Sequence, residues 1–153
     1  MTAPFTFYLR VRYAECDAQS VVFNGKYAEY ADVAATEYTR AIWGDYSCIL
    51  DRGVDNQVVN LNIDWYAPAH FDDVLAIEVQ TSHIGNTSYS LEMVVRRFEA
   101  VASQSNPLAI AKWTYVMVDT DAYSKISIPS DLRAALQRGA PGKRVNQAGC
   151  EIE

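Results

Sequence analysis

One long stretch of helical periodicity lies among segments that alternate like strands, and this contrast constrains the fold more than any other feature of the chain. From about residue 25 to 43, apolar side chains recur at spacings of three and four, as in an amphipathic helix of about five turns. Small side chains let a helix approach a sheet closely, and this helix carries Ala28, Ala31, Ala34 and Ala35. We therefore expect an embedded helix, with Asn24 as its N-cap and Gly44 at its end.

The segments around this helix alternate between apolar and polar residues, as half-buried strands do. They are residues 7–13, 59–65, 75–81, 89–95 and 109–118, and the last is apolar on both faces, which suits a central strand. Short connections between consecutive strands favour antiparallel pairing. Two shorter helices are expected, over residues 45–52 and 130–138. The pattern predicts an α+β protein with the hotdog fold, an antiparallel sheet wrapped around one long central helix.

Length and charge limit the domain count and the partners. The 153 residues suffice for one domain, which we place at residues 1–138; residues 139–153 lack periodicity and are expected to be a loose C-terminal tail. The net charge of −6 argues against nucleic acid or an anionic membrane as the partner. No apolar run approaches the length of about 18 residues that a membrane span needs.

The metal-binding and redox residues are few and widely spaced. Cys16, Cys48 and Cys150 form no CxxC pair, which argues against a disulfide framework or a zinc site and favours a reducing, cytoplasmic location. His70 and His83 are the only histidines, so a mechanism that needs several imidazoles is disfavoured.

The loop between the first strand and the long helix carries two carboxylates, Glu15 and Asp17. The first turn of a helix presents free N–H groups and a partial positive charge. A carboxylate beside it can attack a carbonyl or activate water, while the N–H groups stabilise the oxyanion. The alternative is that the acidic residue only interacts with the helix terminus. Spacing alone does not decide between Glu15 and Asp17.

The segment YAECDAQSVVFNGKYAEYADVA resembles the hotdog-fold acyl-CoA thioesterases of the 4-hydroxybenzoyl-CoA thioesterase type, and WYAPA, FDD and IGNTS further along are also similar. The resemblance implies hydrolysis of an acyl-CoA, or less readily of an acyl-carrier-protein thioester. It implies that Asp17 is the catalytic carboxylate, as nucleophile or general base, and that a backbone N–H near Asn24 polarises the carbonyl. Substrate-binding residues would be Val22, Phe23, Asn24 and Tyr27.

The resemblance also implies a homo-oligomer, a dimer or a tetramer, with the substrate at the subunit boundary. It implies neither metal nor prosthetic group, since CoA enters as part of the substrate. The chain departs from the family in having Ser20 where glycine is common and no basic residue at positions 85–87. These departures support an alternative, a non-catalytic hotdog module that binds an acyl thioester or another apolar ligand. A hotdog dehydratase or hydratase ranks last, because no histidine occurs before His70.

Overall fold

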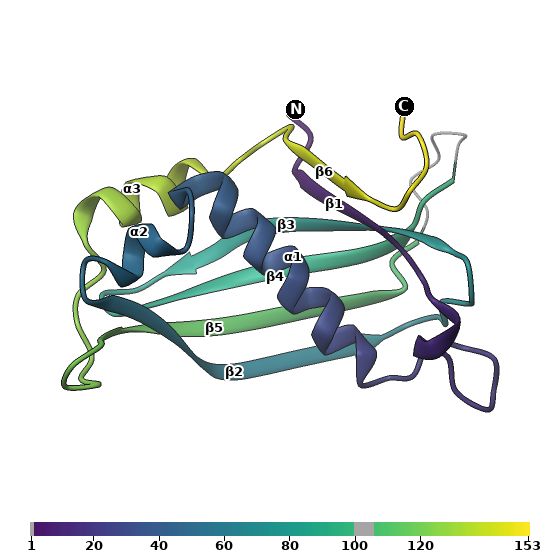
Figure 1. The fold of residues 1–153 in the computed structure, drawn as a ribbon, viewed down its shortest axis with the longest axis horizontal. Coiled ribbons are helices and arrows are strands. Elements are labelled where there is room, and N and C mark those ends of the chain that lie inside the picture. Colours follow the sequence, from purple (N-terminus) through teal and green to yellow (C-terminus); the bar gives the residue numbers. More distant parts are fainter. Residues whose placement is uncertain (1, 100–105) are drawn as a thin grey trace.

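The computed structural model describes residues 2–99 and 106–153 (Figure 1). The strands are β1 (Phe5–Arg10), β2 (Val54–Trp65), β3 (Val74–Ile84), β4 (Ser88–Arg97), β5 (Ala109–Asp119) and β6 (Arg144–Gln147). The helices are the 3₁₀ turn η1 (Tyr13–Glu15), the long α1 (Lys26–Trp43), the short α2 (Ser47–Leu50) and α3 (Ser130–Arg138).

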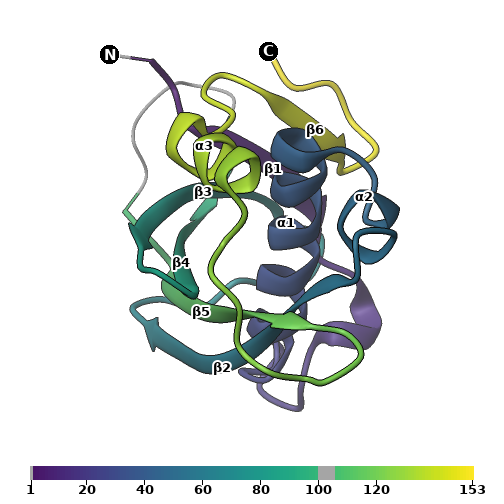
Figure 2. The same ribbon diagram turned by 90° about the vertical axis from the view of Figure 1, so that its left-hand side faces the viewer.

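A single sheet with the strand order β2-β5-β4-β3-β1-β6 forms the body of the fold. Its pairs are antiparallel except β1 with β6, which is parallel. Helix α1 crosses one face of the sheet, and the sheet bends around it (Figures 1 and 2). The expected α+β hotdog architecture is therefore confirmed.

Small and aromatic residues let α1 pack closely against the sheet. Ala31, Ala34 and Ala35 on this helix are all buried. The Tyr38 ring meets the ring of Phe5 on β1 edge to face, with centroids 5.5 Å apart. The helix ends where expected: Gly44 takes a positive φ of 86° and donates its N–H to the Arg40 carbonyl at 3.0 Å.

The expected N-cap at Asn24 is wrong. Helix α1 begins at Lys26 with Gly25 at the cap position, and no side chain caps it. The Asn24 carbonyl instead accepts the Tyr27 N–H at 3.4 Å, and the Phe23 carbonyl accepts the Lys26 N–H at 2.9 Å. The chain enters the helix through a tight turn, which displaces Asn24 from the position where its side chain could reach the second or third N–H.

The expectation of a loose tail after residue 138 is also wrong in part, because residues 144–147 form β6 and pair with β1. The Thr6 N–H donates to the Lys143 carbonyl at 3.0 Å, and the Gly142 N–H donates to the Ala3 carbonyl at 2.7 Å. A four-residue strand between glycines is too short to show periodicity, and its partner lies at the other end of the chain. The extent of the domain, residues 1–138, stays a prediction.

Within the described parts of the chain, no helix combines the length and apolar character needed to cross a bilayer. Nor do three or more His, Cys, Asp or Glu side chains of residues 2–99 and 106–153 converge as metal ligands would.

Candidate active site

The chain between β1 and α1 folds into a closed loop that presents Asp17. The Glu15 carbonyl accepts the Phe23 N–H at 2.9 Å, and the Asp17 N–H donates to the Val21 carbonyl at 2.9 Å. At the tip, the Ser20 N–H donates to the Asp17 carbonyl at 3.0 Å, with Ser20 at φ 64°. This left-handed conformation costs a residue with a Cβ about 1 kcal/mol, a cost that a glycine at this position would avoid. The serine keeps the turn closed all the same.

The Asp17 side chain is half-buried, and its Oδ1 accepts the Gln19 N–H at 2.8 Å. This bond holds the carboxylate against its own turn, as in an Asx turn. No ion pair to Asp17 occurs among residues 2–99 and 106–153. The carboxylate therefore keeps lone pairs available for water or for an electrophile.

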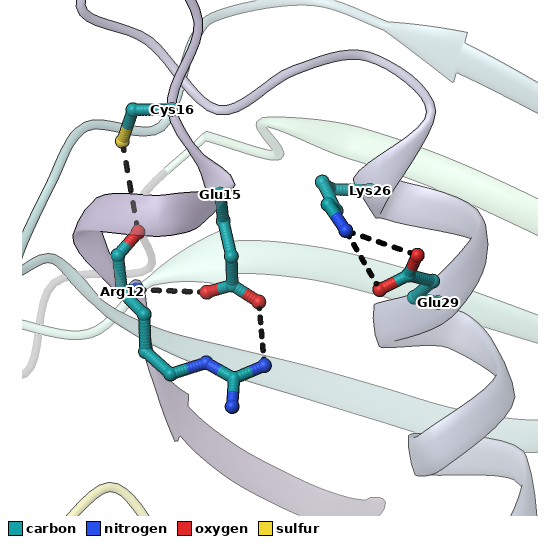
Figure 3. A network of polar contacts seen from close by, with 5 residues as sticks. All are labelled: Arg12, Glu15, Cys16, Lys26 and Glu29. Carbon is teal, nitrogen blue, oxygen red and sulfur yellow. Dashed lines mark hydrogen bonds and ion pairs between the residues drawn. The ribbon is translucent and has the colours of Figure 1, made fainter.

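Glu15, the other candidate acid, has different surroundings (Figure 3). Its side chain is only 5% exposed; its carboxylate accepts the Arg12 backbone N–H at 2.7 Å and the Arg12 guanidinium at 3.0 Å. Burial raises the pKa of Glu15, but these bonds outweigh burial and the net pKa is lowered. Glu15 is thus an ionised carboxylate already occupied by Arg12, which favours Asp17 as the reacting group.

The start of α1 offers two N–H groups that can polarise a carbonyl. In the described part of the chain, the backbone N–H groups of Asn24 and Gly25 have no hydrogen-bond acceptor. A Cβ at Gly25 would lie 2.8 Å from Cε1 of Phe23, so the glycine lets the Phe23 ring lie close to the backbone at this position. Free N–H groups at a helix N-terminus favour a developing negative charge.

A pocket of about 300 Å³ opens beside this helix start, between the loop and the end of β2. Of the expected binding residues, Val22, Asn24 and Tyr27 line it, whereas Phe23 lies outside it and is 51% exposed. Asp17 does not line the pocket either, but its N–H donates to the carbonyl of Val21, and Val21 lines the pocket. The remaining wall consists of Trp65, Tyr66, Ala67 and Pro68.

These wall residues were not expected in the site from the sequence, although two adjacent aromatic residues shortly before a proline were a usable signal. The Trp65 ring lies edge-on to the Tyr27 ring, with centroids 6.3 Å apart. The segment is joined to the loop by the Val22 N–H, which donates to the Ala69 carbonyl at 2.9 Å. The Arg97 guanidinium also binds this segment by donating to the Pro68 carbonyl at 2.9 Å.

The two histidines have different positions. His70 pairs with Val21 through an isolated bridge and lies 3.8 Å from the Asp73 carboxylate, so it borders the loop. His83 is exposed near the far end of β3, in the half of that strand beyond its pairing with β1. All three cysteines are free thiols, and one of them, Cys16, is half-buried beside Asp17 in the sequence.

Comparison with known proteins identifies the family. The model of the thioesterase superfamily matches residues 19–101, a segment that begins two residues after Asp17. The acyl-CoA thioesterase YbgC of Haemophilus influenzae is 27% identical over 134 residues, which cover 86% of this chain and 93% of that protein. A putative esterase of Aquifex aeolicus is 24% identical over 67% of this chain and 80% of its own length.

Among solved structures, a 1,4-dihydroxy-2-naphthoyl-CoA thioesterase from Synechocystis superposes with a TM-score of 0.76 at 20% identity, over 88% of this chain and 96% of that one. This likeness supports the fold. Together with the match to more than half of the chain, it shows that the protein is a hotdog-fold thioester hydrolase of the thioesterase superfamily.

Proposed function

We propose that this protein hydrolyses an acyl-CoA thioester to a free acid and CoA, with Asp17 supplying the attack and the N–H groups of Asn24 and Gly25 holding the oxyanion. One observation carries the proposal. The loop that holds the available Asp17 carboxylate and the helix start that holds the unpaired N–H groups are joined by hydrogen bonds, and both border the same pocket.

The reaction needs no group beyond water. In one route Asp17 takes a proton from water, the water oxygen bonds to the carbonyl carbon, and the C–S bond breaks as the tetrahedral oxyanion collapses. The proton on Asp17 then passes to the departing thiolate. In the other route the carboxylate itself bonds to the carbonyl carbon and expels the thiolate, and water hydrolyses the resulting anhydride. In both, charge develops on the carbonyl oxygen, where the N–H groups are most effective.

The choice of CoA as the carrier rests on relatives. The Haemophilus influenzae relative is an acyl-CoA thioesterase, and its match spans nearly the whole of both chains. An acyl-carrier-protein thioester is the less favoured substrate. We also propose a cytoplasmic location, which the three free cysteines support.

We propose a homo-oligomer, assembled as a dimer and then a tetramer. Strand β2 is an edge of the sheet. The first half of this strand carries Val58 and Val59, which are 48% and 58% exposed. An open apolar edge is usually covered. Light scattering should show an oligomer that dissociates in the Val59→Lys variant, while Arg144→Ala, an exposed change on β6 at the opposite edge of the sheet, leaves the mass unaltered. A monomeric wild-type protein contradicts the assembly.

The activity is tested with a panel of straight-chain, branched and aromatic acyl-CoAs, in which a thiol reagent detects released CoA. Wild-type protein should release CoA, whereas Asp17→Asn should lose activity by about 100-fold or more and keep its melting temperature. Asp121→Asn, which alters an exposed carboxylate in the loop after β5, is the matched control. Binding without release on every substrate favours the non-catalytic module instead.

A single turnover in ¹⁸O-labelled water, combined with trapping by hydroxylamine, separates the two routes. Label that enters Asp17 indicates attack by the carboxylate, followed by hydrolysis of the anhydride at the Asp17 carbonyl carbon. Label confined to the product acid, with no acyl group on Asp17 that hydroxylamine can trap, indicates attack by water. Full activity in a folded Asp17→Ala protein contradicts both.

A further inference from the structure

Glu15 is a buried ion that the proposed reaction does not use. It lies two residues before Asp17, and its residue surface is 4% exposed. Burying a carboxylate is costly unless it is paired and hydrogen-bonded. Here the Arg12 side chain and backbone provide the pairing, while the guanidinium itself remains largely in solvent, with 78% of the side chain exposed. An ion maintained at this position suggests a task other than packing.

Its backbone holds the first rung of the ladder that closes the loop. The Glu15 carbonyl accepts the Phe23 N–H; Cys16 then bridges to Val22, and the Asp17 N–H donates to the Val21 carbonyl. Phe23 immediately precedes the unpaired N–H groups at the start of α1. Glu15 is therefore the point at which the segment that carries Asp17 is fixed to the chain that enters the helix.

The buried Glu15 carboxylate helps to hold the Glu15 backbone in place. By accepting the Arg12 N–H it closes the η1 turn, in which the Glu15 N–H also donates to the Arg12 carbonyl at 3.0 Å. On the other side lies Tyr30 of α1, whose buried hydroxyl has no hydrogen-bond partner among residues 2–99 and 106–153. Burial and then the nearby Glu15 raise the pKa of Tyr30. The ion thus lies between the turn and the helix, beside a pocket of about 290 Å³ lined by Arg12, Glu15 and Tyr30 among others.

We propose that Glu15 is a positioning residue, whose charged pairing with Arg12 fixes the placement of Asp17 relative to the N–H groups of Asn24 and Gly25. The inference rests on the proposed function. Misplacing a reacting group by about 1 Å can cost about 100-fold in rate. Loss of the charge should therefore slow the chemical step more than it weakens substrate binding.

The test compares Glu15→Gln with Glu29→Gln. Glutamine keeps the size of Glu15 and one acceptor oxygen but removes the charge that holds the guanidinium. We expect kcat to fall about tenfold or more while KM stays within about twofold. Glu29 is an exposed carboxylate in the first turn of α1, where it pairs with Lys26 at 3.1 Å (Figure 3). The Glu29→Gln variant should leave both kcat and KM unchanged.

A second readout does not depend on catalysis. In Glu15→Gln, amide hydrogen exchange should accelerate about tenfold or more at Phe23 and Gln19. The Phe23 N–H closes the loop, and the Gln19 N–H holds the Asp17 carboxylate. Amides in the middle of α1 should keep their protection. Arg12→Ala, which leaves the backbone bond in place, should shift kcat and exchange in the same direction by a smaller factor. Because Arg12→Ala alters an exposed side chain, it replaces Glu15→Gln as the test if Glu15→Gln does not fold.

The outcomes separate the two proposals. Wild-type kcat and wild-type loop exchange in Glu15→Gln overturn the positioning role, whereas an inactive Asp17→Asn in the same experiment leaves the proposed function standing. A lower melting temperature with unchanged kcat per folded molecule also overturns it, because that is a purely structural effect. If the wild-type protein hydrolyses no acyl-CoA, the proposed function and the catalytic part of this inference fail together, and exchange alone decides whether Glu15 holds the loop.

Discussion

The Tyr27 hydroxyl accepts the backbone N–H of Ala69 at 3.2 Å, and this contact ties the first turn of α1 to the segment that follows β2. Both residues are buried. Burial raises the pKa of Tyr27, so the hydroxyl remains protonated. Since Tyr27 and the segment before Ala69 both line one pocket, the contact joins two parts of its lining.

Tyr27→Phe should therefore destabilise the protein and loosen the pocket. The buried Ala69 N–H loses its acceptor, which costs about 1–3 kcal/mol in the free energy of unfolding. Urea denaturation measures that cost, and steady-state kinetics should show a raised KM. Tyr66→Phe, whose residue is 63% exposed, is the matched control and should change stability little. Equal stability of the two variants contradicts a structural role for the Tyr27–Ala69 bond.

Gly25→Ala should reduce activity without unfolding the helix. Gly25 has φ −66° and ψ −21°, which alanine adopts freely, so we expect the free energy of unfolding to change by less than about 1 kcal/mol. The new methyl group, however, must displace the Phe23 ring. We expect kcat/KM to fall about tenfold, because the ring or the methyl group then crowds the N–H groups.

A double-mutant cycle with Phe23→Ala identifies which group is responsible. If the displaced ring causes the loss, the methyl group has no further effect once Phe23 is truncated. If Gly25→Ala has the activity of the wild type, the N–H groups at this helix start do not contact the substrate.

Trp65→Ala should weaken substrate binding more than turnover. The ring is half exposed and forms a wall of the pocket, so its loss removes apolar contact with the acyl group. We expect KM to rise about tenfold, equal to about 1.4 kcal/mol of binding, with kcat little changed. Tyr123→Ala, a 73% exposed aromatic residue in the loop after β5, should leave both constants as they are. An unchanged KM in Trp65→Ala places the acyl group elsewhere.

The ion pair between Arg52 and Asp131 should make stability depend on acidic pH. The guanidinium holds both carboxylate oxygens, at 2.7 and 2.9 Å, and lowers the pKa of Asp131 to about 2 from 3.8. A lowered acid pKa contributes stability above the unfolded value, and this contribution is lost as the pH falls from about 3.8 to about 2. Because both side chains are exposed, its size stays below about 1 kcal/mol.

Thermal melts of wild type and Arg52→Ala across pH test this. Their difference in melting temperature should be constant at neutral and mildly acidic pH and should shrink toward zero at the acid end. Added salt should reduce the difference at neutral pH, because exposed ion pairs are screened. A difference that grows on acidification contradicts the assignment.

The periodic elements followed from the sequence because their periodicity reports burial on one face. Helix α1 ends at Trp43, the residue at which the pattern stops, and α3 occupies the expected residues 130–138. The first strand is wrong at its end: β1 covers Phe5–Arg10 rather than residues 7–13, because the chain turns into η1 at Tyr13. The next four strands extend the expected segments by a few residues, and β2 begins at Val54 rather than near Val59. The sequence missed that extension because β2 carries a bulge between Val58 and Asn60, which interrupts the alternation of faces.

What the sequence determined by itself was local: a helix with small residues on its buried face, strands that alternate, and a loop with carboxylates before the helix. What only the tertiary structure decided was which distant groups meet. The occupation of Glu15 by Arg12, the wall formed by Trp65 and Tyr66, and the pairing of β6 with β1 each depend on contacts or burial that no local pattern records. Side-chain periodicity encodes which face of an element is buried, whereas the choice of partner across the fold depends on the shape and charge of the whole chain.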